Sequence, residues 1–164
     1  MARTNEEGRL NFFNALLQSP YLDDRIKAAE ALGVMKDERA VEFLLAALED
    51  PFVEVQWLVA QSLGKIGDSR AVTSLIGKLN SDNKWVRQGS AWALGKIGDP
   101  IATEPLLPLL HDAKVPVRKN AAWALGALGN PLAIAALEEA LTDSDESVRA
   151  EAGKALAKLK GTST

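Results

Sequence analysis

The sequence predicts an all-α fold, an α-solenoid of five two-helix repeats of 31 residues each. Leucines recur at that step at positions 32, 63, 94, 125 and 156, and the register never slips. Other apolar columns keep the same step, and Gly-Asp or Gly-Asn-Pro junctions separate the apolar segments. Self-similarity at a fixed period of about 20 to 50 residues is typical of solenoids, because each unit buries its apolar face only against its neighbours.

The first helix of each repeat is predicted by two apolar columns that lie four residues apart, which is the spacing of one helix face. Residues 70–79 are an example. The two columns are Phe13, Leu44, Leu75, Leu106 and Leu137, and Leu17, Leu48, Leu79, Leu110 and Leu141. The fourth of these helices contains Pro105 and Pro108, so we expect it to be bent or irregular.

The second helix, for example 86–97, is predicted by Val55, Val59, Leu63 and Ile66, which recur as Val86, Ser90, Leu94 and Ile97. At the junctions a glycine can close one helix in the left-handed conformation, and an aspartate or asparagine can cap the next. The repeats are then expected at about 5–35, 36–66, 67–97, 98–128 and 129–160, within a single domain over 1–164 that ends in a tail at 161–164.

Composition narrows the classes of function. The chain has no cysteine, a net charge of −3 and a single histidine. Disulfides and thiolate metal sites are therefore excluded, and a nucleic-acid binder is disfavoured because such proteins usually carry a basic excess. The polar start of the chain and the lack of a long apolar run favour a cytoplasmic protein with no membrane partner, and we expect a monomer.

The strings LGKIGDSRAV and VRQGSAWALGKIGDP resemble the HEAT-like repeats of the phycobilisome (bilin) lyase family, over nearly the whole chain. This resemblance implies the solenoid, and it implies that the second helices line the concave side. It gives no catalytic residue to carry over. A hydroxylase branch of the superfamily binds iron through repeated His-Glu pairs, and a chain with His111 alone contradicts that activity.

All four tryptophans fall on the side of the second helices opposite the buried stripe, in three consecutive repeats. Neighbouring Trp92 and Trp123 are expected about 10 Å apart. Tryptophan is enriched in binding hot spots, so the groove is predicted to bind a partner. The predicted partner-binding residues are Trp57, Leu58, Trp85, Gln88, Trp92, Lys119, Asn120 and Trp123. The competing interpretation is that these rings cover one another or pack on lysine stems.

Other polar groups have structural interpretations. The arginine column Arg25, Arg87, Arg118 and Arg149 is expected to be structural, and family resemblance implies that it bonds to the cap aspartates Asp37, Asp68 and Asp99. His111 is expected at the surface near a helix C-terminus.

The sequence therefore predicts a non-catalytic scaffold or adaptor that binds another protein or peptide through a concave aromatic groove, with no cofactor and no metal. One alternative is a bilin lyase-type subunit or chaperone that holds a tetrapyrrole or its acceptor protein. Another is an engineered repeat binder, although segments such as 101–110 are too individual for one idealised repeat.

Overall fold

The computed structural model describes residues 2–161, with side chains from residue 5 onward. The elements pair into five helical hairpins. The first helices are α1 (Ala2–Leu17), α3 (Val41–Ala47), α5 (Val72–Lys78), α7 (Thr103–Leu106) and α9 (Ile134–Ala140). The second helices are α2 (Leu22–Met35), α4 (Val53–Ile66), α6 (Lys84–Ile97), α8 (Val115–Leu128) and α10 (Glu146–Leu159). Short 3₁₀ helices are η1 (Glu38–Ala40), η2 (Ser69–Ala71), η3 (Pro100–Ala102), η4 (Leu107–His111) and η5 (Pro131–Ala133).

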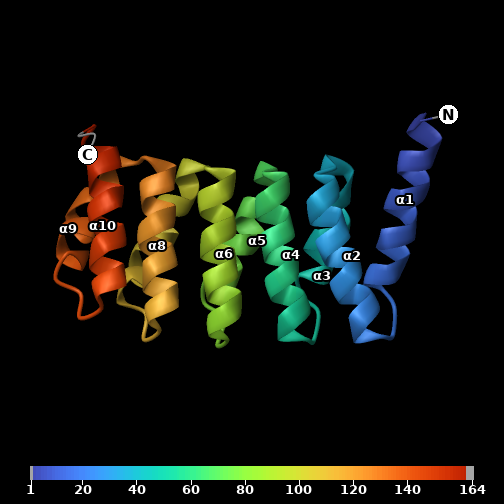
Figure 1. Cartoon of the computed structure of the whole chain (residues 1–164), viewed down its shortest axis with the longest axis horizontal. Coiled ribbons are helices and arrows are strands. Elements are labelled where there is room, and N and C mark those ends of the chain that lie inside the picture. The colour runs from blue at the N-terminus through green and yellow to red at the C-terminus, as the bar shows by residue number, and fades with distance from the viewer. Residues whose placement is uncertain (1, 162–164) are drawn as a thin grey trace.

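The hairpins stack into an elongated two-layer array. The second helices stand side by side along its length, and α3, α5 and α9 lie behind them (Figure 1). The main contacts run from each second helix to the next in chain order, so each described repeat packs mainly on its neighbours, as expected for a solenoid. The predicted all-α solenoid of five two-helix repeats is confirmed. The expected tail lies outside the described residues beyond Gly161.

The junction residues act as predicted. Second helices end at Gly67, Gly98 and Gly129, whose φ angles of 82°, 80° and 70° are left-handed, and each glycine N–H donates to a carbonyl one turn back. Asp68 then accepts the N–H of Arg70 and starts the next 3₁₀ turn, and Asp37, Asp99 and Asn130 do the same in their repeats. In the first repeat Lys36 takes the glycine's place with a φ of 51°.

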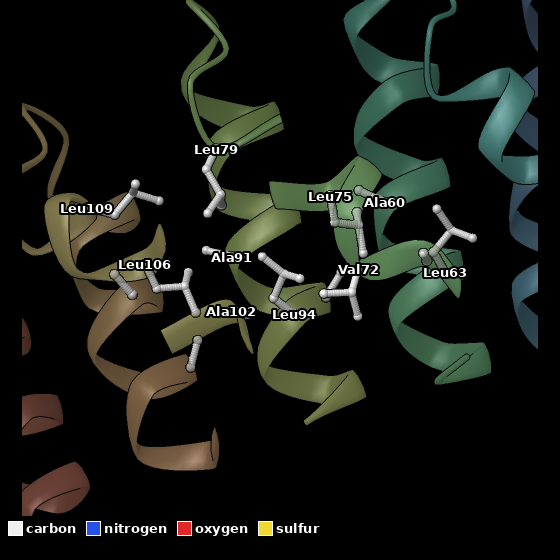
Figure 2. Close-up of a cluster of buried hydrophobic side chains, with 14 of the residues drawn as sticks. Ala60, Leu63, Val72, Leu75, Leu79, Ala91, Leu94, Ala102, Leu106 and Leu109 are labelled. Carbon is white, nitrogen blue, oxygen red and sulfur yellow. The ribbon is translucent and has the colours of Figure 1, made fainter. Parts of the chain in front are cut away.

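The core is a continuous row of apolar side chains between the two layers. Leu63, Leu75 and Leu94 are fully buried there, and Figure 2 shows them within the row of buried side chains that runs through neighbouring hairpins. The proline-containing helix is irregular as predicted, because α7 gives way to η4 at Leu107, one residue before Pro108. The inward faces of α4, α6 and α8 are buried in this core. Their outward faces remain accessible to a binding partner.

Candidate functional site

The first hollow on the second-helix layer lies between α4 and α6. It has a volume of about 250 Å³ and is lined by Val53, Glu54 and Trp57 of α4 and by Trp85 of α6. We call it the α4–α6 hollow. Trp85 is 47% exposed, and Trp57 is half-buried. Two indoles and a valine make the walls apolar, and Glu54 is the one charged side chain among the four.

Gly89 determines where the Trp57 indole lies. A Cβ at Gly89 of α6 would stand 2.9 Å from Trp57 Cδ1, closer than carbon atoms can approach. The lack of a side chain at this position therefore lets the Trp57 ring lean across the surface of α6, where it becomes a wall of the α4–α6 hollow.

The second hollow crosses α6, α8 and α10, and we call it the α6–α10 hollow. It has a volume of about 550 Å³. Trp92 and Trp123 stack in it with ring centroids 6.4 Å apart and planes 15° from parallel. The rings are thus closer than the expected 10 Å helix spacing. Each ring lies toward the preceding helix, where a Cβ at Gly64 would stand 3.0 Å from Trp92 and a Cβ at Gly95 would stand 2.6 Å from Trp123.

Polar side chains surround this indole pair. The hollow is lined by Gln88, Trp92, Val115, Pro116, Lys119, Asn120, Trp123, Ser147 and Glu151. The Asn120 side-chain amide donates to the Pro116 carbonyl at 2.9 Å, which fixes the direction of its oxygen. Glu151 pairs with Lys154 at 3.7 Å, and the Lys96 ammonium lies 5.5 Å from the Trp92 ring centroid. The arrangement can offer hydrogen bonds around a flat apolar floor.

Seven of the eight residues predicted from the sequence line one of these two hollows. Trp57 and Trp85 line the smaller one. The larger one is lined by the five others, which are Gln88, Trp92, Lys119, Asn120 and Trp123. Leu58 lines neither hollow, because it packs against the core.

Sequence reasoning missed Val53, Glu54, Val115, Pro116, Ser147 and Glu151 as lining residues. The 31-residue period could have predicted three of these lining residues. Glu54, Pro116 and Ser147 occupy the 31-residue column of Trp85, so the position of that ring on α6 already placed them on the same face.

Trp92 and Trp123 take part in both the core and the surface. Both are half-buried and pack against the hydrophobic core. They also stack on one another, and Lys96 lies over Trp92, as the competing interpretation held, yet both line the α6–α10 hollow. A substitution by alanine at either position therefore removes packing as well as surface, and a test of binding needs other variants beside it.

The arginine column is structural, but its partners differ from the expected ones. Arg25, Arg87 and Arg118 pair with Asp50, Asp112 and Asp143, each 25 residues further on in the next repeat, at 2.7–2.8 Å. The expectation of the cap aspartates was wrong, because Asp37 and Asp68 bond to Arg39 and Arg70 in their own turns.

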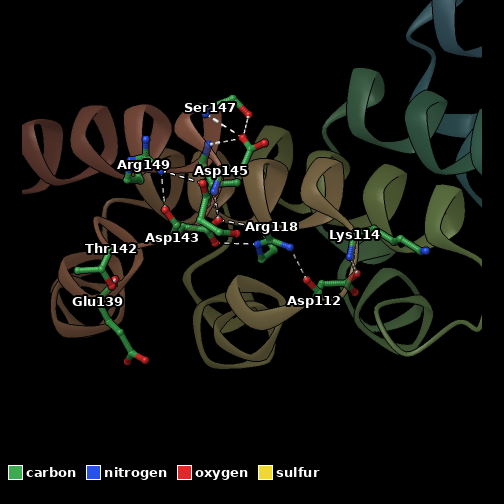
Figure 3. A network of polar contacts seen from close by, with 11 residues as sticks. Asp112, Lys114, Arg118, Glu139, Thr142, Asp143, Asp145, Ser147 and Arg149 are labelled. Atoms are coloured by element: carbon green, nitrogen blue, oxygen red, sulfur yellow. Dashed lines mark hydrogen bonds and ion pairs between the residues drawn. The ribbon is translucent and has the colours of Figure 1, made fainter.

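Each arginine also donates to the carbonyl six residues before it, for example Arg118 to Asp112 at 2.9 Å (Figure 3). Arg149 makes the same bond to Asp143. The hydrogen bond from Arg118 holds the pKa of the Asp143 carboxyl below its usual range, against the opposing effect of burial. These ion pairs join successive repeats, and the chemistry of the column is satisfied within the protein.

The other polar candidate from the sequence, His111, lies outside both hollows. His111 is exposed at the end of η4, as expected. Among the described residues no group of three or more His, Cys, Asp and Glu side chains could hold a metal ion. None of the helices described is long and apolar enough to cross a membrane.

A row of helical hairpins with an aromatic surface on one layer defines a helical-repeat scaffold. The sequence matches the family of HEAT repeats over residues 11–84 and 74–157, and the chain belongs to this family. The expected likeness to the bilin lyase type is confirmed by the structure of the complex of CpcE and CpcF of phycocyanin lyase from Nostoc sp. PCC7120. That match has 29% identity and a TM-score of 0.85, and it covers 93% of this chain and 65% of that one.

Designed proteins share the fold. An engineered protein matches with 24% identity and a TM-score of 0.72, over 96% of this chain and 81% of that one. A designed armadillo repeat protein in complex with the peptide (KR)4 matches with 21% identity and a TM-score of 0.70, over 96% of this chain and 84% of that one. A comparison with curated protein sequences gave no significant match.

Proposed function

We propose that this protein is a non-catalytic scaffold that binds a segment of a partner protein across the outward faces of α4, α6, α8 and α10. The observation that carries the proposal is the pair of hollows on one layer, each walled by two tryptophans and both including residues of α6. Tryptophan dominates binding hot spots because one rigid side chain covers a large area at little cost in conformational entropy.

The geometry supports an extended segment as the occupant. Neighbouring packed helices lie about 8–10 Å apart, which is the length of roughly three residues of extended chain. A strand laid along the array would therefore present a side chain to one hollow and, a few residues further on, another to the next. The buried leucines behind α4, α6 and α8 hold the surface in place before the partner arrives. This side of the interface therefore loses little conformational entropy on binding.

The test uses peptides selected from a random displayed library against the full chain, with affinities measured by calorimetry. Trp85→Ala should weaken them at least tenfold, since this ring is 47% exposed and carries little of the core. Ile101→Ala is the control, because Ile101 is 67% exposed on η3, away from both hollows. Lys119→Ala tests the α6–α10 hollow in the same way. The proposal would be contradicted if the peptides bound both variants as tightly as they bind the wild type.

A second candidate function is that of a lyase-type subunit or chaperone that holds a tetrapyrrole or its acceptor protein. The match to the phycocyanin lyase complex favours it, although the chain spans only 65% of that chain. The stacked indoles of the α6–α10 hollow would offer a flat apolar wall to such a ring system. Saturable quenching of tryptophan fluorescence by a linear tetrapyrrole, lost in Trp92→Phe and Trp123→Phe, would favour this function over the scaffold.

A further inference from the structure

We propose that the α4–α6 hollow takes a cationic side chain, lysine or arginine, from the partner segment. This inference rests on the proposed scaffold function and names the chemistry of one of its two hollows. The argument comes from the walls of the hollow, from its one charged group and from its size.

The walls suit a cation because the face of an indole ring carries negative electrostatic potential. The protein already uses its tryptophans in this way. The Lys84 ammonium lies 4.8 Å from the centroid of Trp85, and Lys96 lies over Trp92. Trp85 thus already holds an ammonium group over its ring, and Trp57 adds a second indole to the same hollow.

The charge in the hollow points the same way. Glu54 is exposed and lines the hollow, and no lysine or arginine among residues 5–161 forms an ion pair with it. The other hollow differs, because Lys119 brings a positive charge there and Glu151 already pairs with Lys154. Of the two hollows, only the α4–α6 hollow therefore combines two indoles with a carboxylate that has no ion-pair partner among residues 5–161, and Lys84 over Trp85 is the cation with which an incoming group competes.

The size of the hollow suits a side chain. Its volume of about 250 Å³ lies below the 300–1,000 Å³ or so of sites for drug-sized molecules. It can admit the end of one long side chain, and the guanidinium or ammonium group would then contact both ring faces and the carboxylate.

The experiment follows the four indole N–H signals of the ¹⁵N-labelled full chain by NMR, each assigned with a Trp→Phe variant. The probes are the blocked tripeptides Gly-Arg-Gly, Gly-Lys-Gly, Gly-Gln-Gly and Gly-Glu-Gly. We expect saturable shifts of the Trp57 and Trp85 signals with the arginine and lysine peptides, and no saturation with the glutamine or glutamate peptides. The Trp92 and Trp123 signals should stay in place.

Two charge variants sharpen the test because they should act in opposite directions. Glu54→Gln removes the attracting carboxylate and should weaken binding of the arginine peptide by up to about fivefold. Lys84→Gln removes a competing ammonium from Trp85 and should strengthen binding about twofold. Glu54 lies on the outer face of α4 and Lys84 begins α6, and circular dichroism of both variants is the check that they fold.

The pattern of outcomes decides between occupants. An apolar occupant would leave both variants unchanged, and an anionic one would reverse both signs, so either result would overturn the inference. Absence of any saturable shift with arginine or lysine would overturn it as well. The scaffold function would still stand if library-selected peptides lost affinity in Trp85→Ala, so the two failures can be told apart.

Discussion

Two buried serines differ in whether their hydroxyl groups form a hydrogen bond. Ser62 of α4 donates its hydroxyl to the Ala29 carbonyl of α2 at 2.7 Å. Ser90 of α6 is equally buried, yet within the described part of the chain its hydroxyl oxygen has no hydrogen-bond partner. Its column otherwise contains alanine or valine, as at Val59 and Ala121. The Ser62 hydroxyl therefore replaces its lost water contacts with a hydrogen bond, whereas the Ser90 hydroxyl does not.

Replacing these serines by alanine should therefore change stability in opposite directions. Ser90→Ala should raise the free energy of unfolding by about 1 kcal/mol, since a buried unsatisfied hydroxyl costs on that order. Ser62→Ala should lower it by about 0.5–1.5 kcal/mol through loss of one net hydrogen bond. Urea denaturation measures both values, and a loss of stability in Ser90→Ala would show that its hydroxyl has a partner.

The arginine–aspartate pairs join one hairpin to the next, and the residues at the two positions of a pair change together along the sequence. Where Gln56 replaces arginine in the column, Ser81 replaces the aspartate 25 residues later. Gln56 keeps the bond to the carbonyl of Asp50 at 2.6 Å, so the local contact survives while the charged link to the next repeat is lost. The junction between α4 and α6 is thus the one without this ion pair among the four junctions of the described array.

The pair between Arg118 and Asp143 should contribute to stability in a pH-dependent way. The pKa of Asp143 is lowered in the folded protein, so its contribution is present above the ordinary aspartate pKa of about 3.9 and is lost as the pH falls through the lower folded pKa. Arg118→Gln should lower the free energy of unfolding by about 1.5–3 kcal/mol at pH 7. The variant should also lose less stability than wild type between pH 5 and pH 2, as urea titrations would show.

The reciprocal change provides the control. Gln56→Arg with Ser81→Asp installs the same ion pair at the α4–α6 junction and should stabilise the protein, whereas neither single change should. If the two single effects sum to the double effect, the link between repeats has no measurable coupling energy and the interpretation of the column is wrong.

Cohesion along the array depends on glycines that face the next repeat. A Cβ at Gly95 would lie 2.6 Å from the Trp123 ring and 2.8 Å from Ala124 Cα, and Gly64 and Gly126 are as close to their neighbours. Gly77 of α5 has no atom within 4 Å of such a Cβ. Glycine is therefore required where helices of successive repeats touch, and is merely tolerated elsewhere.

Gly95→Ala should separate α6 from α8 and lower the free energy of unfolding by about 1–3 kcal/mol. Gly77→Ala, the matched control, should raise it by up to about 1 kcal/mol, because alanine favours a helix interior. Thermal and urea unfolding measure both, and a smaller urea dependence in Gly95→Ala would indicate that the two halves of the array unfold separately. Similar stabilisation by both substitutions would contradict the role given to Gly95.

The fold could be predicted from the sequence because a solenoid repeats its local signals. The leucine columns recur four or five times, and the glycine stops and the aspartate or asparagine caps recur three or four times, so a local error would have broken the register. The site was predicted less completely. Period and face indicate which side of a helix a tryptophan takes, but they do not show that Trp57 leans onto Gly89 or that Arg118 reaches Asp143 and not a cap aspartate. Those contacts join different repeats and depend on the offset between neighbouring helices.

The missing ion pair and the smaller hollow occur at the same joint, between α4 and α6. On the first-helix side this joint is held by Arg70 with Glu42 and by Lys78 with Glu49. The edge beside Gln56 lacks the arginine–aspartate pair, so α4 and α6 are joined there by close packing, with Gly64 against Ala93 and Gly89 against Trp57. The walls of the smaller hollow are therefore held by this packing, whereas charge pairs contribute only on the first-helix side of the joint.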